Sequence, residues 1–165
     1  MLTVKRIYIE GGRGTVGDTA YSFVDKVLKR RYGNSVTFAL DFEAEEVIAE
    51  IKKAGFNCGL DGYEWNLSEP SDFVPGKMVY VEGDFGMVKV VVKELVPSDK
   101  RGIRAKVNIP NSRKQAVFVS IPSQEEFEYK IRKEVGLGGL ERYQRQVKER
   151  DTKWKEQFVS NALSA

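Results

Sequence analysis

The sequence predicts an α+β protein in which a small α/β layer is followed by a small β-barrel and by helices at the C-terminal end. Apolar residues follow alternating strand and helix periods over the first 65 residues. Strand-like alternation dominates residues 73–122, and helical spacing returns after Pro122. We therefore expect three parts: an α/β domain at 1–70, a β-barrel at 73–122 and a helical extension at 123–165.

The first part is expected to alternate strands with helices. Strands are predicted at 4–10, 35–42 and 56–65, where β-branched and aromatic residues are concentrated. Helices are predicted at 18–32 and 43–54, because apolar residues recur there every three or four positions. Gly33 and Gly55 are expected to end these helices. Residues 67–72 are expected to form a short linker.

The second part has the turn residues that separate short antiparallel strands. Strands are expected at 77–82, 87–95, 103–109 and 115–121. A Pro-Gly turn precedes the first strand, a Gly-Asp-Phe-Gly turn follows it, and loops with proline and basic residues separate the others. Short strands joined by Gly and Pro turns are typical of a small β-barrel.

The third part is predicted to contain two helices. Ser123 and Glu126 have the spacing of a capping box, which marks the start of the first helix. Gly136 is expected to end it, and a Gly-Gly pair at 138–139 separates it from a last helix at about 141–163. Arg150 and Asp151 interrupt the apolar stripe of that helix, so a long coiled coil is not expected.

The composition excludes several kinds of chemistry. The chain has no histidine, which removes Ser-His-Asp triads, histidine acid–base catalysis and the usual zinc sites. Its one cysteine, Cys58, forms no internal disulfide and is expected to be a half-buried structural thiol. No apolar run approaches the about 20 residues that span a bilayer. We therefore expect a cytoplasmic protein that is not an enzyme, holds no cofactor and does not contact the membrane.

The net charge of +3 is distributed unevenly. Residues 41–72 hold nine acidic and two basic groups, whereas residues 73–122 hold nine basic and four acidic groups. Between residues 100 and 122 there is no carboxylate, and the cations predicted to bind nucleic acid are Lys100, Arg101, Arg104, Lys106, Arg113 and Lys114. Cations on adjacent loops suit phosphate oxygens. The alternative is that they only make the surface soluble.

Two further sets of residues bear on the same prediction. Lys26, Lys29 and Arg30 lie at spacings of three and four near the end of the first helix, so they are predicted to form a phosphate-binding ridge. The alternative is that they complement the helix dipole. Aromatic residues in the second part could stack on bases if exposed, or could belong to the core: Tyr80, Phe85 and Phe118.

From Phe73 onward the chain resembles the KOW domain, the SH3-like barrel at the C-terminus of NusG-type transcription elongation factors. The resemblance covers about 50 residues. It consists of the entry Pro75-Gly76-Lys77-Met78-Val79, the turn Val81-x-Gly83-x-Phe85, and strands at 88–95, 104–109 and 116–119. The resemblance implies an SH3-like barrel that serves as an adaptor for nucleic acid, RNA polymerase or the ribosome.

Two motifs suggest other chemistry. A glycine-rich loop from Gly11 to Thr19 has P-loop spacing, but Asp18 replaces the phosphate-binding lysine, so ATP hydrolysis is not expected. The loop weakly resembles nucleotide-sensing SLOG-type loops, which take a phosphate at a helix start; the alternative is a plain turn. Carboxylates that follow strands could share a metal ion in a nuclease, or form an acidic surface: Asp41, Glu43, Asp61 and Glu64.

Together these features predict a non-catalytic nucleic-acid-binding protein. It is expected to bind double-stranded DNA largely without sequence specificity, to act in transcription or nucleoid organisation, and to be nucleoid-associated. Two alternatives stay open. One is an adaptor that binds RNA polymerase or the ribosome, and the other is a nucleotide sensor that uses the Gly11 to Thr19 loop.

Overall fold

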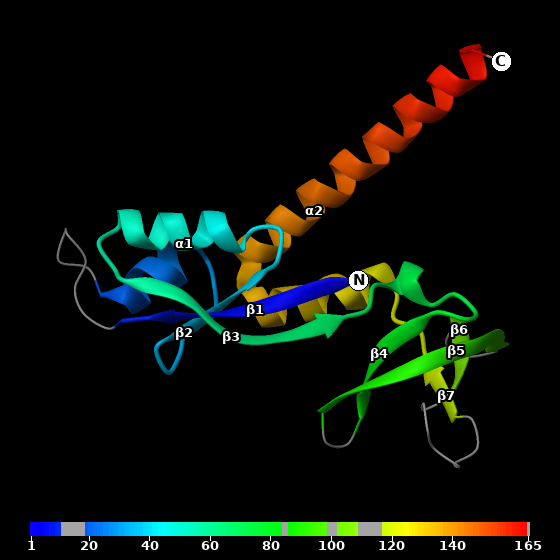
Figure 1. The fold of residues 1–165 in the computed structure, drawn as a ribbon, viewed down its shortest axis with the longest axis horizontal. Coiled ribbons are helices and arrows are strands. Elements are labelled where there is room, and N and C mark those ends of the chain that lie inside the picture. The colour runs from blue at the N-terminus through cyan, green and yellow to red at the C-terminus, as the bar shows by residue number, and fades with distance from the viewer. Residues whose placement is uncertain (11–18, 84–85, 99–101, 109–116, 165) are drawn as a thin grey trace.

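The computed structural model describes residues 1–10, 19–83, 86–98, 102–108 and 117–164. It is an α+β structure with two antiparallel sheets (Figure 1). The first sheet holds β1 (Leu2–Ile9), β2 (Val36–Leu40) and β3 (Cys58–Leu67). The second holds β4 (Met78–Gly83), β5 (Gly86–Ser98), β6 (Gly102–Asn108) and β7 (Val117–Ser120). The α-helices are α1 (Ala44–Lys53) and α2 (Gln124–Ser164).

The first sheet has the order β2-β1-β3, and β1 pairs antiparallel with both neighbours. Strands β2 and β3 therefore run in the same direction, and α1 connects them across the central strand, as in a split β-α-β unit. The predicted order of strands and helices is confirmed. The order of the strands within the sheet could not be predicted in the same way, because the alternation of strands and helices along the chain does not determine which strands become neighbours.

The first helix is much shorter than predicted. Instead of spanning 18–32, it is a π-helical segment, η1 (Ser22–Val27). Lys29 adopts a left-handed conformation with φ of 54°, which a right-handed helix cannot contain. In this conformation its carbonyl oxygen accepts a hydrogen bond from the N–H of Gly138, at 2.9 Å. A long-range contact with α2 therefore accompanies the end of the local helix.

Apolar side chains cover both faces of the first sheet. On one face, Ile7 and Ile9 pack with Val47 and Ile51 of α1. On the other, Leu2, Val4 and Leu40 form one cluster with the first part of α2, whose contributing residues are Phe127, Ile131 and Val135. Side chains alternate between the faces of a strand, so the sheet lies between two helical layers.

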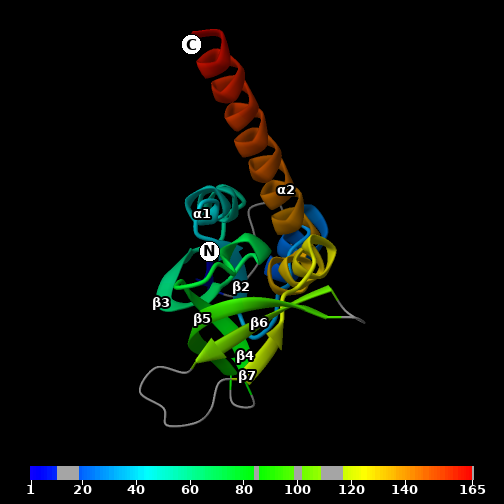
Figure 2. The same ribbon diagram turned by 90° about the vertical axis from the view of Figure 1, so that its right-hand side faces the viewer.

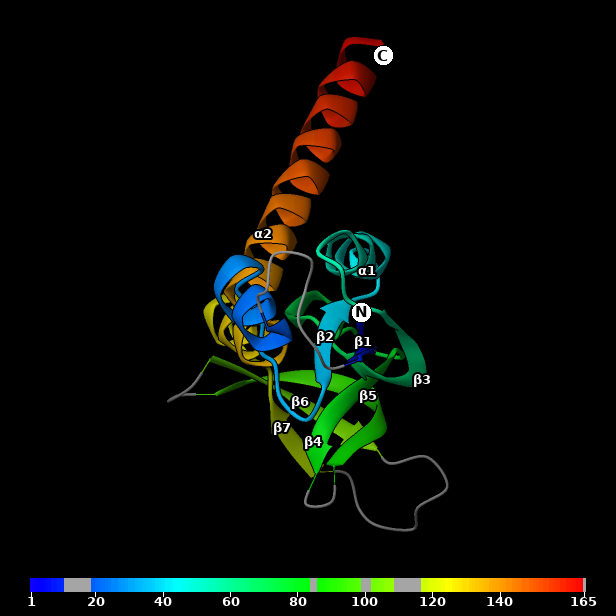
Figure 3. The same cartoon turned by 90° about the vertical axis from the view of Figure 1, so that its left-hand side faces the viewer.

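Helix α2 turns sharply at Gly136, where φ is 78° and ψ is 176°. The turn packs tightly on residues 28–30, since a Cβ on Gly138 would lie 2.1 Å from the carbonyl oxygen of Leu28. The predicted break at Gly136 is thus confirmed as a kink, whereas Gly138 and Gly139 lie within the helix that follows it. Beyond it α2 projects away from both sheets toward the C-terminus, as all three ribbon views show (Figures 1, 2 and 3).

The second sheet has the order β4-β5-β6-β7, with every neighbouring pair antiparallel. The four predicted strands are confirmed to within a few residues at their ends. The predicted closed barrel is wrong for the part of the chain that the structure describes, because β4 and β7 are both edge strands and do not pair with each other. Turn spacing predicts strands, whereas closure depends on strand tilt and stagger.

Four residues of the segment between the two sheets are buried: Ser68, Glu69, Asp72 and Phe73. This segment contains a 3₁₀ turn, η2 (Pro70–Asp72), and the Oγ of Ser68 accepts a hydrogen bond from the N–H of Tyr80 in β4. Tyr143 of α2 donates its hydroxyl proton to Glu69 Oε2 at 3.1 Å, and burial raises the pKa of Tyr143 to about 12. Lys130 of α2 also pairs with Glu82 of β4 at 2.9 Å. These contacts fix both sheets against α2.

Candidate nucleic-acid interface

The alternating side chains of the second sheet separate a buried face from an exposed one. Val90, Val92, Ala105 and Val107 are buried in one apolar cluster. Residues between them in sequence point to the opposite side. We call this side the outer face and define it by the following described residues: Lys89, Glu94, Arg104, Lys106, Phe118 and Ser120.

The register of β6 and β7 brings two chemically different side chains together. Lys106 lies directly opposite Phe118, and Arg104 lies directly opposite Ser120. Side chains at such opposed positions have Cβ atoms about 4.5–5.5 Å apart. The Phe118 side chain is 55% exposed, and Arg104 is also exposed. The sheet therefore presents an exposed aromatic ring beside a cation, with a second cation two residues along β6.

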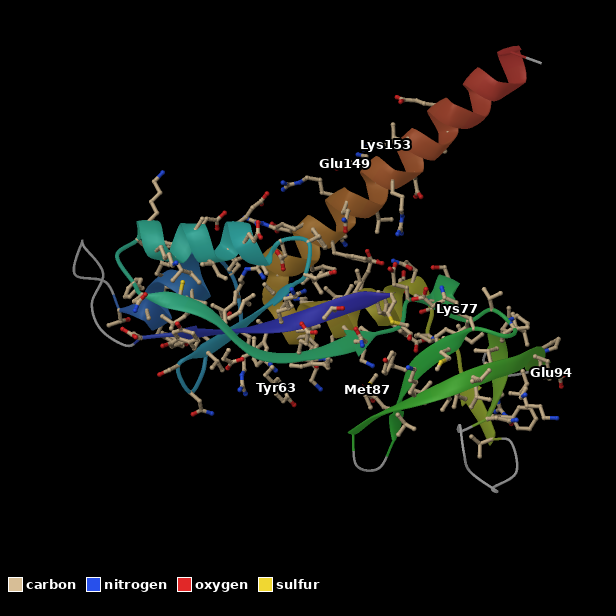
Figure 4. The ribbon with its side chains drawn as sticks, viewed as in Figure 1. Tyr63, Lys77, Met87, Glu94, Glu149 and Lys153 are labelled. Atoms are coloured by element: carbon tan, nitrogen blue, oxygen red, sulfur yellow. The ribbon has the colours of Figure 1, made fainter. Side chains whose placement is uncertain are left out.

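The charge of the outer face is positive. Among the described residues, no carboxylate lies within 4.0 Å of the charged nitrogens of Lys89, Arg104 or Lys106. Glu94, labelled in Figure 4, is opposite Lys106 in the register. Glu82 of β4 is on the same side, because it lies two positions after Tyr80, the register partner of Lys89. The nearby Glu82 is already paired with Lys130, whose hydrogen bond lowers the pKa of that carboxyl. The arrangement suits a ligand with several negative charges.

The structure brings together two of the six cations predicted for the second part, Arg104 and Lys106. The other four, Lys100, Arg101, Arg113 and Lys114, lie outside the described residues, as does Phe85. Lys89 and Glu94 were not among the site residues predicted from the sequence. Alternation with the buried Val90 indicates Lys89, but the same alternation from Val92 would place Glu94 on the buried face. Glu94 reaches the outer face because the register shifts between Val92 and Glu94, and spacing alone does not reveal such a shift.

Arg30 was predicted as a phosphate contact, and that prediction is wrong. Its side chain is 2% exposed and forms an ion pair with Glu43. The same guanidinium donates hydrogen bonds to the carbonyl oxygens of Phe38 and Val135, at 3.2 and 3.4 Å. Arg30 thus joins η1, β2, α1 and the kink of α2. Lys26 and Lys29 are exposed, so two members of that predicted ridge remain accessible.

A second exposed aromatic residue lies on the first sheet. Tyr63 of β3 is 55% exposed, and the Arg6 guanidinium lies 4.5 Å from the centroid of its ring. Unlike Lys106, Arg6 is ion-paired, since its Nε lies 2.6 Å from Asp61 Oδ2. The backbone N–H of Tyr63 and the side chain of Arg6 both donate hydrogen bonds to the Asp61 carboxylate. These bonds, the one from Tyr63 most, lower the pKa of Asp61. The cation beside Tyr63 is therefore already neutralised.

The predicted metal-binding carboxylates do not form a cluster. Glu43 pairs with Arg30 and Asp61 pairs with Arg6. Within the described part of the chain, no three potential ligands lie close enough to hold a metal ion. Cys58 is buried, and burial raises the pKa of its thiol, which disfavours the reactive thiolate. The Gly11 to Thr19 loop, for which anion binding and a plain turn were the two alternatives, lies outside the described residues up to position 18.

One pocket of about 710 Å³ opens between the first sheet and α2. Its lining mixes both signs of charge, with Asp41, Glu69 and Glu149 beside Arg150 and Lys153. Glu149 and Lys153 come from the projecting part of α2 (Figure 4). Carboxylates that face such a pocket repel phosphate groups, so this pocket does not extend the candidate interface.

No described helix is both long and apolar enough to cross a bilayer. Comparison of the chain with models of protein families, with curated proteins and with solved structures finds no match in any of the three.

Proposed function

We propose that the protein binds nucleic acid through the outer face of the second sheet and catalyses no reaction. One observation carries the proposal: Arg104 and Lys106 lie side by side on β6 without a described carboxylate partner, next to the exposed ring of Phe118. Cations two residues apart on a strand are separated by about 7 Å. They can therefore contact successive phosphates of one strand.

Such binding carries little sequence information. Contacts with phosphates fix the position of a protein on nucleic acid but do not distinguish bases. The loops that connect β5 to β6 and β6 to β7 add four cations in sequence: Lys100, Arg101, Arg113 and Lys114. We include these residues in the proposed surface. The resemblance to the KOW domain favours a place in transcription or nucleoid organisation, and this assignment is part of the proposal.

The second candidate function is an adaptor for RNA polymerase or the ribosome. It is favoured by two apolar side chains on neighbouring strands at one end of the second sheet. Ile103 of β6 is 51% exposed and Leu95 of β5 is 41% exposed. Contiguous exposed apolar side chains, unlike single ones, are typical of surfaces that bind other proteins. Such an adaptor would co-purify with its partner after nuclease treatment.

Charge reversal tests the proposed function. The double variant Arg104→Glu and Lys106→Glu is expected to bind a labelled oligonucleotide at least about tenfold more weakly at low ionic strength, because two attractive contacts become repulsive. Fluorescence anisotropy measures the affinity, and circular dichroism checks that the variant is folded. The substitution Glu94→Gln removes a negative charge from the outer face and is expected to raise the affinity.

The matched control reverses two exposed cations elsewhere, at Lys52 and Lys53 in the last turn of α1. It changes the net charge by the same amount. The proposal predicts that Lys52→Glu with Lys53→Glu keeps most of the affinity. An equal loss in both double variants would mean that net charge, rather than the outer face, determines binding.

A further inference from the structure

We infer that the ligand of the outer face is an unpaired nucleic-acid strand, with a base stacked on Phe118 and the adjoining phosphates on Lys106 and Arg104. This inference rests on the proposed function and names its substrate class. It differs from the duplex expected from the sequence, because it assigns a binding role to an aromatic side chain as well as to the cations.

The first argument is the accessibility of the Phe118 ring. Phe118 is on the edge strand β7 and is 55% exposed, and among the described aromatic residues none forms a ring pair with it. Bases in a duplex stack on each other, so a ring reaches a base face there only where the stack is opened, whereas an unpaired strand leaves its base faces accessible. Surfaces that bind single strands combine such rings with cations along the backbone path.

The second argument is the pairing of this ring with an available cation. Lys106 lies opposite Phe118, and no described carboxylate lies within 4.0 Å of its amino group. A nucleotide has an aromatic base and a phosphate close together, so this ring and amino group match both of its parts. Charge complementarity therefore favours a nucleotide strand over an uncharged ligand such as a sugar.

Tyr63 on the first sheet supplies the contrast. It has the same 55% exposure as Phe118, yet Arg6 covers its ring and Trp65 packs on it with ring centroids 5.7 Å apart. Arg6 is also held by Asp61. An equally exposed aromatic residue thus lacks both an open ring and an available cation, and it is not included in the proposed site.

The test compares three labelled probes by fluorescence anisotropy: an oligothymidylate of about 15 nucleotides, a duplex of equal length, and an abasic strand with the same number of phosphates. The oligothymidylate is expected to bind most tightly. Phe118→Ala should weaken its binding by roughly 5- to 150-fold, the range for one stacked base. Binding of the duplex and of the abasic strand should not change.

Tyr63→Ala is the matched control and is expected to leave all three affinities unchanged. Phe118→Leu keeps an apolar side chain on β7 but removes the ring, and circular dichroism of both variants separates the loss of stacking from unfolding. Comparison with an oligouridylate of equal length determines whether the protein prefers unpaired DNA or unpaired RNA. Tighter binding of either single strand than of the duplex supports the inference.

Two results would overturn the inference. In the first, all three probes bind equally well, Phe118→Ala has no effect, and the Arg104→Glu and Lys106→Glu variant loses binding. This result would leave the proposed function standing and remove the unpaired strand as its substrate. Equal losses in Phe118→Ala and Tyr63→Ala would remove Phe118 as the stacking residue. Absence of binding to every probe would reject the proposed function itself.

Discussion

The Arg30 guanidinium connects β2, the start of α1 and the kink of α2 to the segment that follows η1. It pairs with Glu43 at the start of α1, and Glu43 Oε2 also accepts the backbone N–H of Leu40 at 2.9 Å. In sequence Arg30 looks like its neighbours Lys29 and Arg31, because a partner 13 positions away leaves no local pattern. Spacing along one helix therefore could not distinguish this buried cation from an exposed one.

The substitution Arg30→Met is expected to lower the free energy of unfolding by about 3–5 kcal/mol. It leaves the buried Glu43 carboxylate without its close partner, and the Nε of Arg142 is 3.9 Å away. Urea denaturation followed by circular dichroism measures the change. Arg31→Ala is the control, because Arg31 is 47% exposed and its ion pair with Glu134 spans 3.8 Å. The control is expected to lose about 1 kcal/mol or less. A similarly small loss for Arg30→Met would contradict a structural role for the pair.

At the scale of elements, local sequence predicts each strand and helix better than it predicts their assembly. Ser123 does begin α2, and its Oγ accepts the N–H of Glu126 at 3.1 Å as the capping pattern predicts. The strands of the second sheet follow from alternation and turn residues. The open edge of that sheet and the short η1 depend on contacts between distant segments, and the outer face depends on register, so none of them follows from spacing alone.

The kink of α2 tests this dependence on distant contacts. Gly138→Ala is expected to cost about 1–3 kcal/mol of stability, because the new Cβ would clash with the Leu28 carbonyl. Gly33→Ala is a matched change at a position where a new Cβ meets nothing within 4 Å. It is expected to be nearly neutral. Thermal unfolding of both variants measures the difference, and equal melting temperatures would mean that the kink relaxes at little cost.

At the scale of the whole molecule, the acidic and basic regions lie on different elements. The α1 helix carries Glu45, Glu46 and Glu50, and Arg142 of α2 pairs with the last two. The second sheet, whose outer face carries Lys89, Arg104 and Lys106, lies at the other end of the first sheet (Figure 1). A long polyanion is therefore expected to favour the second sheet over α1, where Lys52, Lys53 and Arg142 offset the carboxylates.

The salt dependence of binding tests the central claim most directly. The logarithm of the association constant for a single strand, plotted against the logarithm of salt concentration, is expected to fall linearly with a slope of about −0.7 per phosphate contact. Replacement of Arg104 and Lys106 by alanine should reduce the magnitude of this slope by about 1.4, because two contacts are lost. An unchanged slope in that variant would contradict binding of phosphates by the outer face.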